Sequence, residues 1–171
     1  MTPFDTTMNG PLMLTAHAYH GHAHTTPIGE VVLDYEGRFL RRKVITLTDD
    51  RRCLVDLPQT TSLDAGGVLV TDAGEVTVVA APEPLLEVRG DGLVRLAWHI
   101  GNRHTPCQIE EDRLLIQRDH VLRDMLERLG AELAEVVEPF TPEGGAYGHG
   151  RTHGHDHSHS HGPDTHVHAH G

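Results

Sequence analysis

The sequence predicts an α+β protein with an N-terminal all-β domain, a ferredoxin-like βαββαβ domain and a disordered histidine-rich tail. Short β-type runs without helical period fill residues 28–80. Two amphipathic helical patterns alternate with short strands over residues 81–140. Apolar side chains become rare over residues 141–171, which we therefore assign to the tail. Residues 1–27 are polar and contain histidines, so we expect a flexible N-terminal arm there.

The first domain shows no helical period. Two β-branched runs between residues 67 and 79 flank Asp72-Ala73-Gly74, where glycine can adopt positive φ, and this pattern predicts a hairpin. Further strands are expected at residues 30–35, 42–48 and 53–57. Together they indicate an all-β domain.

The second domain begins after Ala81-Pro82-Glu83-Pro84, which reads as a connection. An amphipathic helix is predicted from apolar residues at i, i+3, i+4 and i+7, namely Leu93, Leu96, Ala97 and Ile100. Gly101 is its expected stop. A second helix is predicted to begin at the N-cap Asp119 and to stop at Gly130. Strands before, between and after these helices complete the order strand–helix–strand–strand–helix–strand.

Composition narrows the class of partner. The 171 residues carry a formal charge of -11 with histidine neutral, which argues against nucleic acid, whose binding uses a surplus of Lys and Arg. No stretch approaches the ~18 apolar residues of a membrane span. The two cysteines, Cys53 and Cys107, form no CxxC motif or disulfide framework, and no signal peptide is apparent. We expect a cytoplasmic protein without membrane or nucleic-acid partners.

Sixteen histidines are the unusual feature of this composition. Imidazole is a common ligand of nickel, copper and zinc, and alternate histidines on a flexible chain can converge on one ion. An artificial tag or a solubilising tail is the alternative reading, but the run is interleaved with small residues. The predicted metal ligands of the tail are His149, His153, His155, His157, His159, His161, His166, His168 and His170.

Three histidines, His99, His104 and His120, are expected around the ends of the two helices. Each is a candidate metal ligand, and each alone is as well explained as a capping or surface residue. Four more lie in the expected arm, and they form either an auxiliary metal site or a low-complexity segment: His17, His20, His22 and His24.

A family resemblance rests on residues 98–106 (WHIGNRHTP), Gln108-Ile109 and residues 119–130 (DHVLRDMLERLG). These motifs, with the flanking segments 80–88 and 139–149, resemble the UreE family of urease accessory nickel chaperones over about residues 28–171. The resemblance implies an N-terminal β domain and a ferredoxin-like domain that joins two copies into a homodimer.

The resemblance also implies site residues and partners. His104 would lie at the dimer interface, where two copies bind one metal ion, while His99 and His120 would match additional or peripheral sites. Some members carry a histidine where this chain has Arg118, which weakens a metal pair at His120. The implied partners are a urease accessory GTPase and the apo-urease assembly complex.

The function predicted is therefore delivery of Ni²⁺ for assembly of the urease active site, with Zn²⁺ or Cu²⁺ able to bind the same ligands. General nickel or zinc storage is the alternative. A metallohydrolase is not expected because no motif places a general base beside histidine ligands, so the chain is predicted not to be an enzyme.

Overall fold

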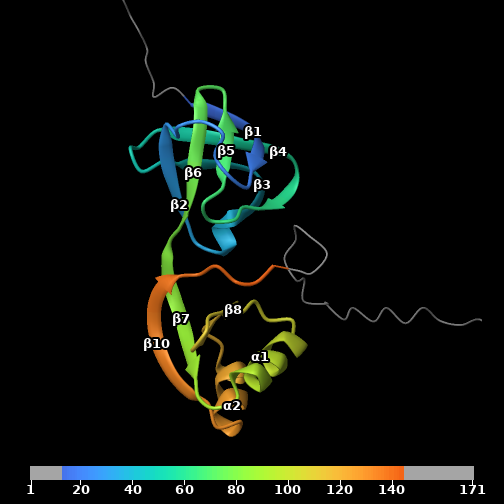
Figure 1. The fold of residues 1–171 in the computed structure, drawn as a ribbon. Coiled ribbons are helices and arrows are strands. Elements are labelled where there is room, and N and C mark those ends of the chain that lie inside the picture. Colours follow the sequence, from blue (N-terminus) through green and yellow to red (C-terminus); the bar gives the residue numbers. More distant parts are fainter. Residues whose placement is uncertain (1–12, 145–171) are drawn as a thin grey trace, which may run out of the picture.

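A computed structural model of the chain describes residues 13–144, which form two units with one β-sheet each (Figure 1). The N-terminal unit contains β1 (Leu14–His20), β2 (Gly29–Leu33), the 3₁₀ turn η1 (Glu36–Arg38), β3 (Phe39–Thr46), β4 (Arg52–Ser62), β5 (Val68–Thr71) and β6 (Gly74–Ala80). The C-terminal unit contains β7 (Pro82–Arg89), α1 (Leu93–Asn102), β8 (Gln108–Ile109), β9 (Leu114–Gln117), α2 (His120–Arg128) and β10 (Glu132–Pro139). Neither helix of residues 13–144 has the length and apolar character needed to cross a membrane.

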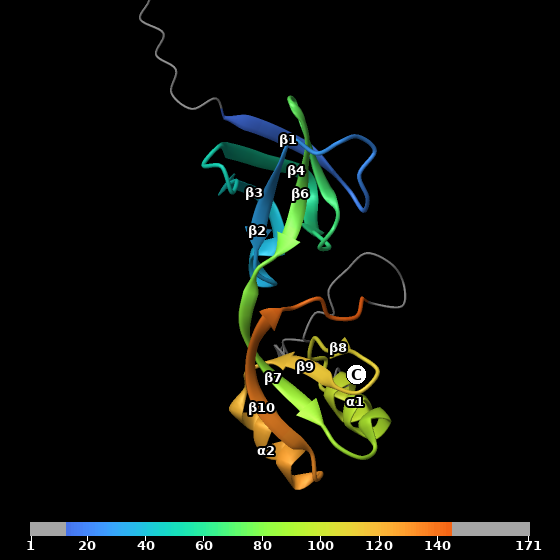
Figure 2. The same cartoon turned by 60° about the vertical axis from the view of Figure 1, so that its left-hand side comes forward.

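The six-stranded sheet has the order β2-β6-β5-β1-β4-β3 and curls around its own core (Figure 2). Side chains alternate between its faces, so Val76 and Val78 of β6 point inward together and are fully buried. Val31 of β2 and Val55 of β4 join the same core. The hairpin predicted around Asp72-Ala73-Gly74 is confirmed, because β5 pairs antiparallel with β6 across it.

The prediction of a flexible arm over residues 1–27 is wrong for residues 14–20. Those residues form β1, which lies between β5 and β4 and pairs with both. Leu14 and Ala16 are buried beneath these neighbours. The alternation was hard to recognise in the sequence because its inward positions are partly alanine and its outward positions include His17, whereas the sheet supplies the burial that makes it a strand.

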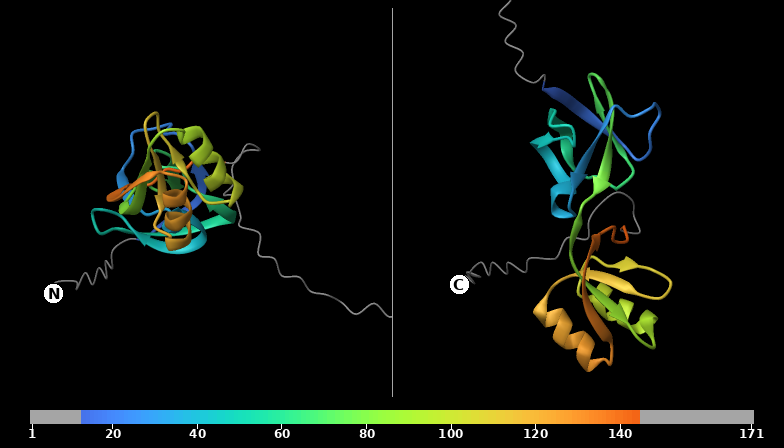
Figure 3. Two further views of the ribbon diagram at one scale, coloured as in Figure 1. Left: turned by 90° about the horizontal axis from the view of Figure 1, so that it is seen from below. Right: turned by 90° about the vertical axis from the view of Figure 1, so that its left-hand side faces the viewer.

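The C-terminal sheet has the order β10-β7-β9-β8, and every neighbouring pair is antiparallel. Both helices lie on one face of it (Figure 3, right). The face is built from alternate residues of β7 and β9, with Leu86 and Val88 beside Leu114 and Ile116. The predicted order of helices and strands is the one observed.

The start of α2 also agrees with the prediction. The Asp119 carboxylate accepts a hydrogen bond from the Leu122 amide at 2.9 Å, so it caps a helix that begins at His120.

The prediction of a connection at residues 81–84 is wrong. Strand β7 already begins at Pro82 and only Ala81 separates it from β6, because the pairing of β7 with β10 runs as far as Pro82.

A small buried cluster joins the two units. Phe140 packs with Leu85 and Leu115 from the open face of the C-terminal sheet, and Tyr35 of the N-terminal unit contacts them. The buried Arg38 guanidinium donates to the carbonyls of Leu33 and Phe140, one in each unit. These bonds satisfy buried polar groups that would otherwise cost stability.

The first residues assigned to the disordered tail are held in place. The Thr141 amide donates to Gln108 Oε1 at 2.8 Å, and the Glu143 amide donates to the Cys107 carbonyl at 2.9 Å. The prediction of a tail from residue 141 is therefore wrong for residues 141–144. The nine tail histidines, from His149 onward, lie outside the described residues.

The open face of the C-terminal sheet carries a network of charges. Arg113 lies 2.8 Å from Glu87 and 2.7 Å from Glu138, and Arg89 also reaches Glu87 at 2.8 Å. Hydrogen bonds from Arg89 and Arg113 lower the pKa of Glu87, and the bond from Arg113 lowers the pKa of Glu138. Arg113, which directly precedes β9, thereby links Glu87 of β7 with Glu138 of β10.

This network predicts acid sensitivity. A carboxyl whose pKa falls on folding stabilises the fold above its unfolded pKa of about 4.3, and this contribution is lost as pH falls through the folded pKa. We expect the free energy of unfolding, measured with urea from about pH 6 to pH 3, to fall less steeply in Arg113→Gln than in the parent. Arg95 is an exposed residue of α1, and Arg95→Gln is the matched control. It should leave the slope of the unfolding free energy against pH unchanged. Equal slopes in Arg113→Gln and the parent would contradict the role of the network.

Candidate metal site

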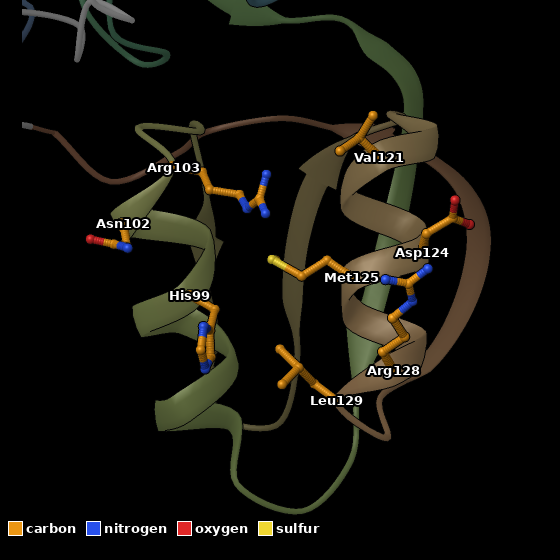
Figure 4. A pocket seen from close by; sticks show the side chains of 8 residues that line it. All are labelled: His99, Asn102, Arg103, Val121, Asp124, Met125, Arg128 and Leu129. Carbon is orange, nitrogen blue, oxygen red and sulfur yellow. The ribbon is translucent and has the colours of Figure 1, made fainter.

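The predicted body histidines lie on the two-helix layer. Helices α1 and α2 run side by side in opposite directions, so the end of α1 and the start of α2 lie at the same end of the layer (Figure 4). His104 follows the end of α1, and His120 is the first residue of α2. Both side chains are exposed, whereas His99 in the last turn of α1 is partly buried.

The end of α1 is set by His104 rather than by Gly101. The helix continues through Gly101 to Asn102, which corrects the predicted stop. The His104 amide donates to the Gly101 carbonyl at 3.0 Å and the Thr105 amide to the Ile100 carbonyl at 3.5 Å, the pair of bonds of a Schellman motif. This motif requires a left-handed residue, and His104 supplies it with φ of 58°.

The position of His104 is one that glycine usually occupies. A side chain in the left-handed region costs roughly 1–2 kcal/mol, although histidine is among the residues found there more often than most. Such strain, when observed, points to a function for the side chain. The imidazole of His104 stands at an exposed turn where a ligand can be reached from outside.

A groove of about 480 Å³ runs between the two helices. His99 of α1 and Arg103, which directly follows this helix, line one side of the groove (Figure 4). Met125 of α2 and Leu129, which directly follows α2, line the other side. Of the four apolar residues of α2, Leu122 and Leu126 are buried, whereas Met125 is partly buried and Val121 is exposed.

Large apolar side chains on both helices remain uncovered. Val94 and Trp98 of α1 are 85% and 63% exposed, and Val121 of α2 and Leu129 just after it are also exposed. Exposed apolar side chains on two neighbouring helices are typical of an interaction site. His99 lines the groove together with Val121 and Leu129, and His104 and His120 lie at one end of the helical layer.

Two neighbouring residues have structural roles. Arg118 directs its guanidinium to the carbonyls of Leu85 and Val136, both at 3.1 Å, so it supports the sheet. Cys107 is buried in the helix–sheet core, and burial raises the pKa of its thiol to about 11. This thiol therefore packs in the core and, unlike the imidazoles, is not presented to solvent.

The histidines of the helical layer do not complete a metal site within one chain. No group of three or more histidine, cysteine, aspartate or glutamate side chains within residues 13–144 is arranged to hold an ion. His99, His104 and His120 therefore share a helical layer without converging on one point. Any ion held there needs ligands from another copy or from residues beyond 144.

Two family models match this chain almost from end to end. The C-terminal domain of the UreE urease accessory protein matches residues 83–170, and the N-terminal domain matches residues 13–82. The chain belongs to the UreE family of urease accessory proteins. The boundary between the two matches coincides with the passage from β6 to β7.

Relatives named urease accessory protein UreE agree with this membership. One from a Ruegeria species is 68% identical over 148 residues, which cover 85% of this chain and 84% of the relative. Those of Ruegeria pomeroyi and Paracoccus denitrificans are 65% and 59% identical over 124 residues, covering 72% of this chain and 83% and 79% of the relatives. Membership of the UreE family implies a role in urease maturation.

The strain at His104 gives a stability prediction. His104→Gly should raise the free energy of unfolding by about 0.5–1 kcal/mol, because glycine adopts positive φ without steric cost. His99→Gly, five residues earlier inside α1, should lower it by about 1 kcal/mol. Urea unfolding of the metal-free protein measures both. A loss of stability in His104→Gly would show that the imidazole itself stabilises the fold.

Proposed function

We propose that this UreE family member binds Ni²⁺ between two copies of the chain and passes it to the urease assembly complex. The observation that carries the proposal is the exposed imidazole of His104 in a position that favours glycine, at the border of an uncovered apolar surface. Imidazole nitrogen suits nickel, and also zinc or copper, which would compete for the same ligands.

A second copy of the chain supplies what one copy lacks. Two copies related by a two-fold axis and packed through Val94, Trp98 and Val121 would cover apolar surface on both. The same axis would bring a second His104 without any further sequence requirement. His99 and His120, on the same helical layer, are proposed as peripheral ligands.

The position of the last described residues supports a role for the tail in the coordination. The Glu143 amide is bonded to the carbonyl of Cys107, three residues after His104 along the chain. From Gly144, five residues lead to His149, a reach of at most about 18 Å. We therefore propose that the nearest tail histidines share the ion at His104 and that the remaining ones add capacity.

Delivery distinguishes this proposal from storage. Two imidazoles leave coordination positions open, and a partner's ligands can enter there, whereas a closed four-ligand site retains its ion.

The urease accessory GTPase is the proposed recipient of the ion, and the cytoplasm is the proposed location. The strand order of the C-terminal unit supports a ferredoxin-like assignment for it.

Loss of the His104 imidazole tests the function. His104→Asn keeps a residue that tolerates the left-handed conformation while removing the metal ligand. In cells that depend on this chain for urease maturation, we expect at least about tenfold lower urease activity at limiting nickel, a loss of 1.4 kcal/mol in binding. His120→Asn, at the other helix end, should have a smaller effect. Unchanged urease activity with less bound nickel in His104→Asn would favour storage.

The proposed interface has its own test. Trp98→Glu places a charge within the uncovered apolar surface and should convert the dimer to a monomer in light scattering at micromolar concentration. Ile109→Glu, at an exposed apolar residue of β8 away from the helices, is the control. A dimer that persists in Trp98→Glu and dissociates in Ile109→Glu would place the interface elsewhere.

A further inference from the structure

Three histidines converge in the loop that follows β1. His20 ends the strand, and His22 and His24 follow at alternate positions. His20 Nδ1 lies 3.2 Å from His24 Nε2, with ring centroids 5.1 Å apart. The ring of His22 lies 4.7 Å from that of His24. All three side chains are exposed, so solvent ions reach them directly.

The backbone of this loop is anchored on both sides of the histidines. His20 pairs with Val68 of β5 within the sheet. The amides of His24 and Thr25 donate to the carboxylate of Glu75 on β6, and so does the Thr25 hydroxyl. The Thr25 hydroxyl, followed by the two amides, lowers the pKa of Glu75, so this carboxylate stays ionised and keeps its hold at neutral pH.

The two facing nitrogens have the spacing of metal ligands. Histidine nitrogen binds zinc at about 2.0–2.1 Å, and two such bonds spanning the 3.2 Å separation meet at about 100–106°, close to a tetrahedral angle. In the absence of metal, the nitrogens can approach this closely when one carries a proton and the other accepts it. A metal ion would replace that shared proton and bind both.

We propose that His20 and His24, joined by His22, bind a divalent transition-metal ion on the N-terminal unit. No three ligands within residues 13–144 already surround one point, so His22 supplies the third nitrogen by a rotation of its exposed side chain. Water completes the coordination. The fixed backbone lowers the entropic cost of gathering the ligands.

This site is separate from the one proposed at His104. The loop belongs to the six-stranded unit, whereas α1 and α2 belong to the other unit (Figure 2). Binding at His20 and His24 needs neither a second copy nor the tail. The chain would then carry a metal site in each of its two units, and the N-terminal one would exist in the monomer.

Nitrogen NMR of the full-length chain with Zn²⁺ as probe tests the assignment. Imidazole ¹⁵N signals report which ring nitrogen binds, and assigning them to individual residues separates this loop from the other histidines. We expect metal-type shifts at His20 Nδ1 and His24 Nε2 that reach saturation at one equivalent of zinc for this loop. Absence of these shifts at excess zinc, or binding through the opposite nitrogens, would overturn the proposal.

Calorimetry on matched variants gives the second measurement. In the full-length chain, His20→Ala with His24→Ala should remove one zinc equivalent per chain, and His22→Ala should weaken that equivalent at least about tenfold, a loss found even when a group that only orients a ligand is removed. His17→Ala is the control, because His17 lies on the same strand as His20 and its ring contacts the Asp56 carbonyl of β4. Equal losses in His17→Ala and in the double variant would overturn the site, while His104→Asn should retain it.

Discussion

The left-handed backbone at His104 determines how the C-terminal unit ends its first helix and where its exposed imidazole stands. The bonds from His104 and Thr105 close α1, and the chain then turns so that Cys107 enters the core between helices and sheet. The carbonyl of Cys107 in turn holds Glu143. One backbone conformation thus links the helix end, the core beneath it and the point from which the tail departs.

The two units cover their sheets in different ways. The N-terminal sheet curls on itself and encloses its own core, so it needs no helix to cover it. The C-terminal sheet uses α1 and α2 on one face and charged side chains on the other, and its helices leave apolar residues uncovered. Arg38 bonds to carbonyls of both units. The most exposed large apolar side chains, Val94, Trp98 and Val137, therefore lie on the C-terminal unit.

Sequence patterns predicted the elements whose stability is local or amphipathic. The hairpin turn at Asp72-Ala73-Gly74 and the cap at Asp119 depend on nearby residues, and both are observed. Strand β1 was missed because its stability comes from β4 and β5, far along the chain. Gly101 was a reasonable helix stop by composition, but the hydrogen bonds of the Schellman motif place the stop at His104.

For the candidate ligands, too, the sequence did not reveal features that depend on long-range contacts. His104 was singled out by its resemblance to a family motif, while its strained backbone is visible only in the structure. The approach of His20 to His24 depends on the path of a loop held by Glu75, a residue about 50 positions away. Spacing along the chain does not encode such a contact. Composition indicated metal binding, and geometry shows which nitrogens face one another.

Sharing of one ion between two chains is the central claim, and mixed dimers test it directly. The parent would be the full-length chain with the tail histidines and His20 changed to Asn, and its partner a ¹⁵N-labelled version that also carries His104→Asn. Native mass spectrometry with Ni²⁺ resolves the parental and mixed dimers by mass. One retained nickel on the parental dimer and none on the mixed dimer is the predicted result. Nickel retained equally on mixed dimers, or on single chains, would contradict the shared site.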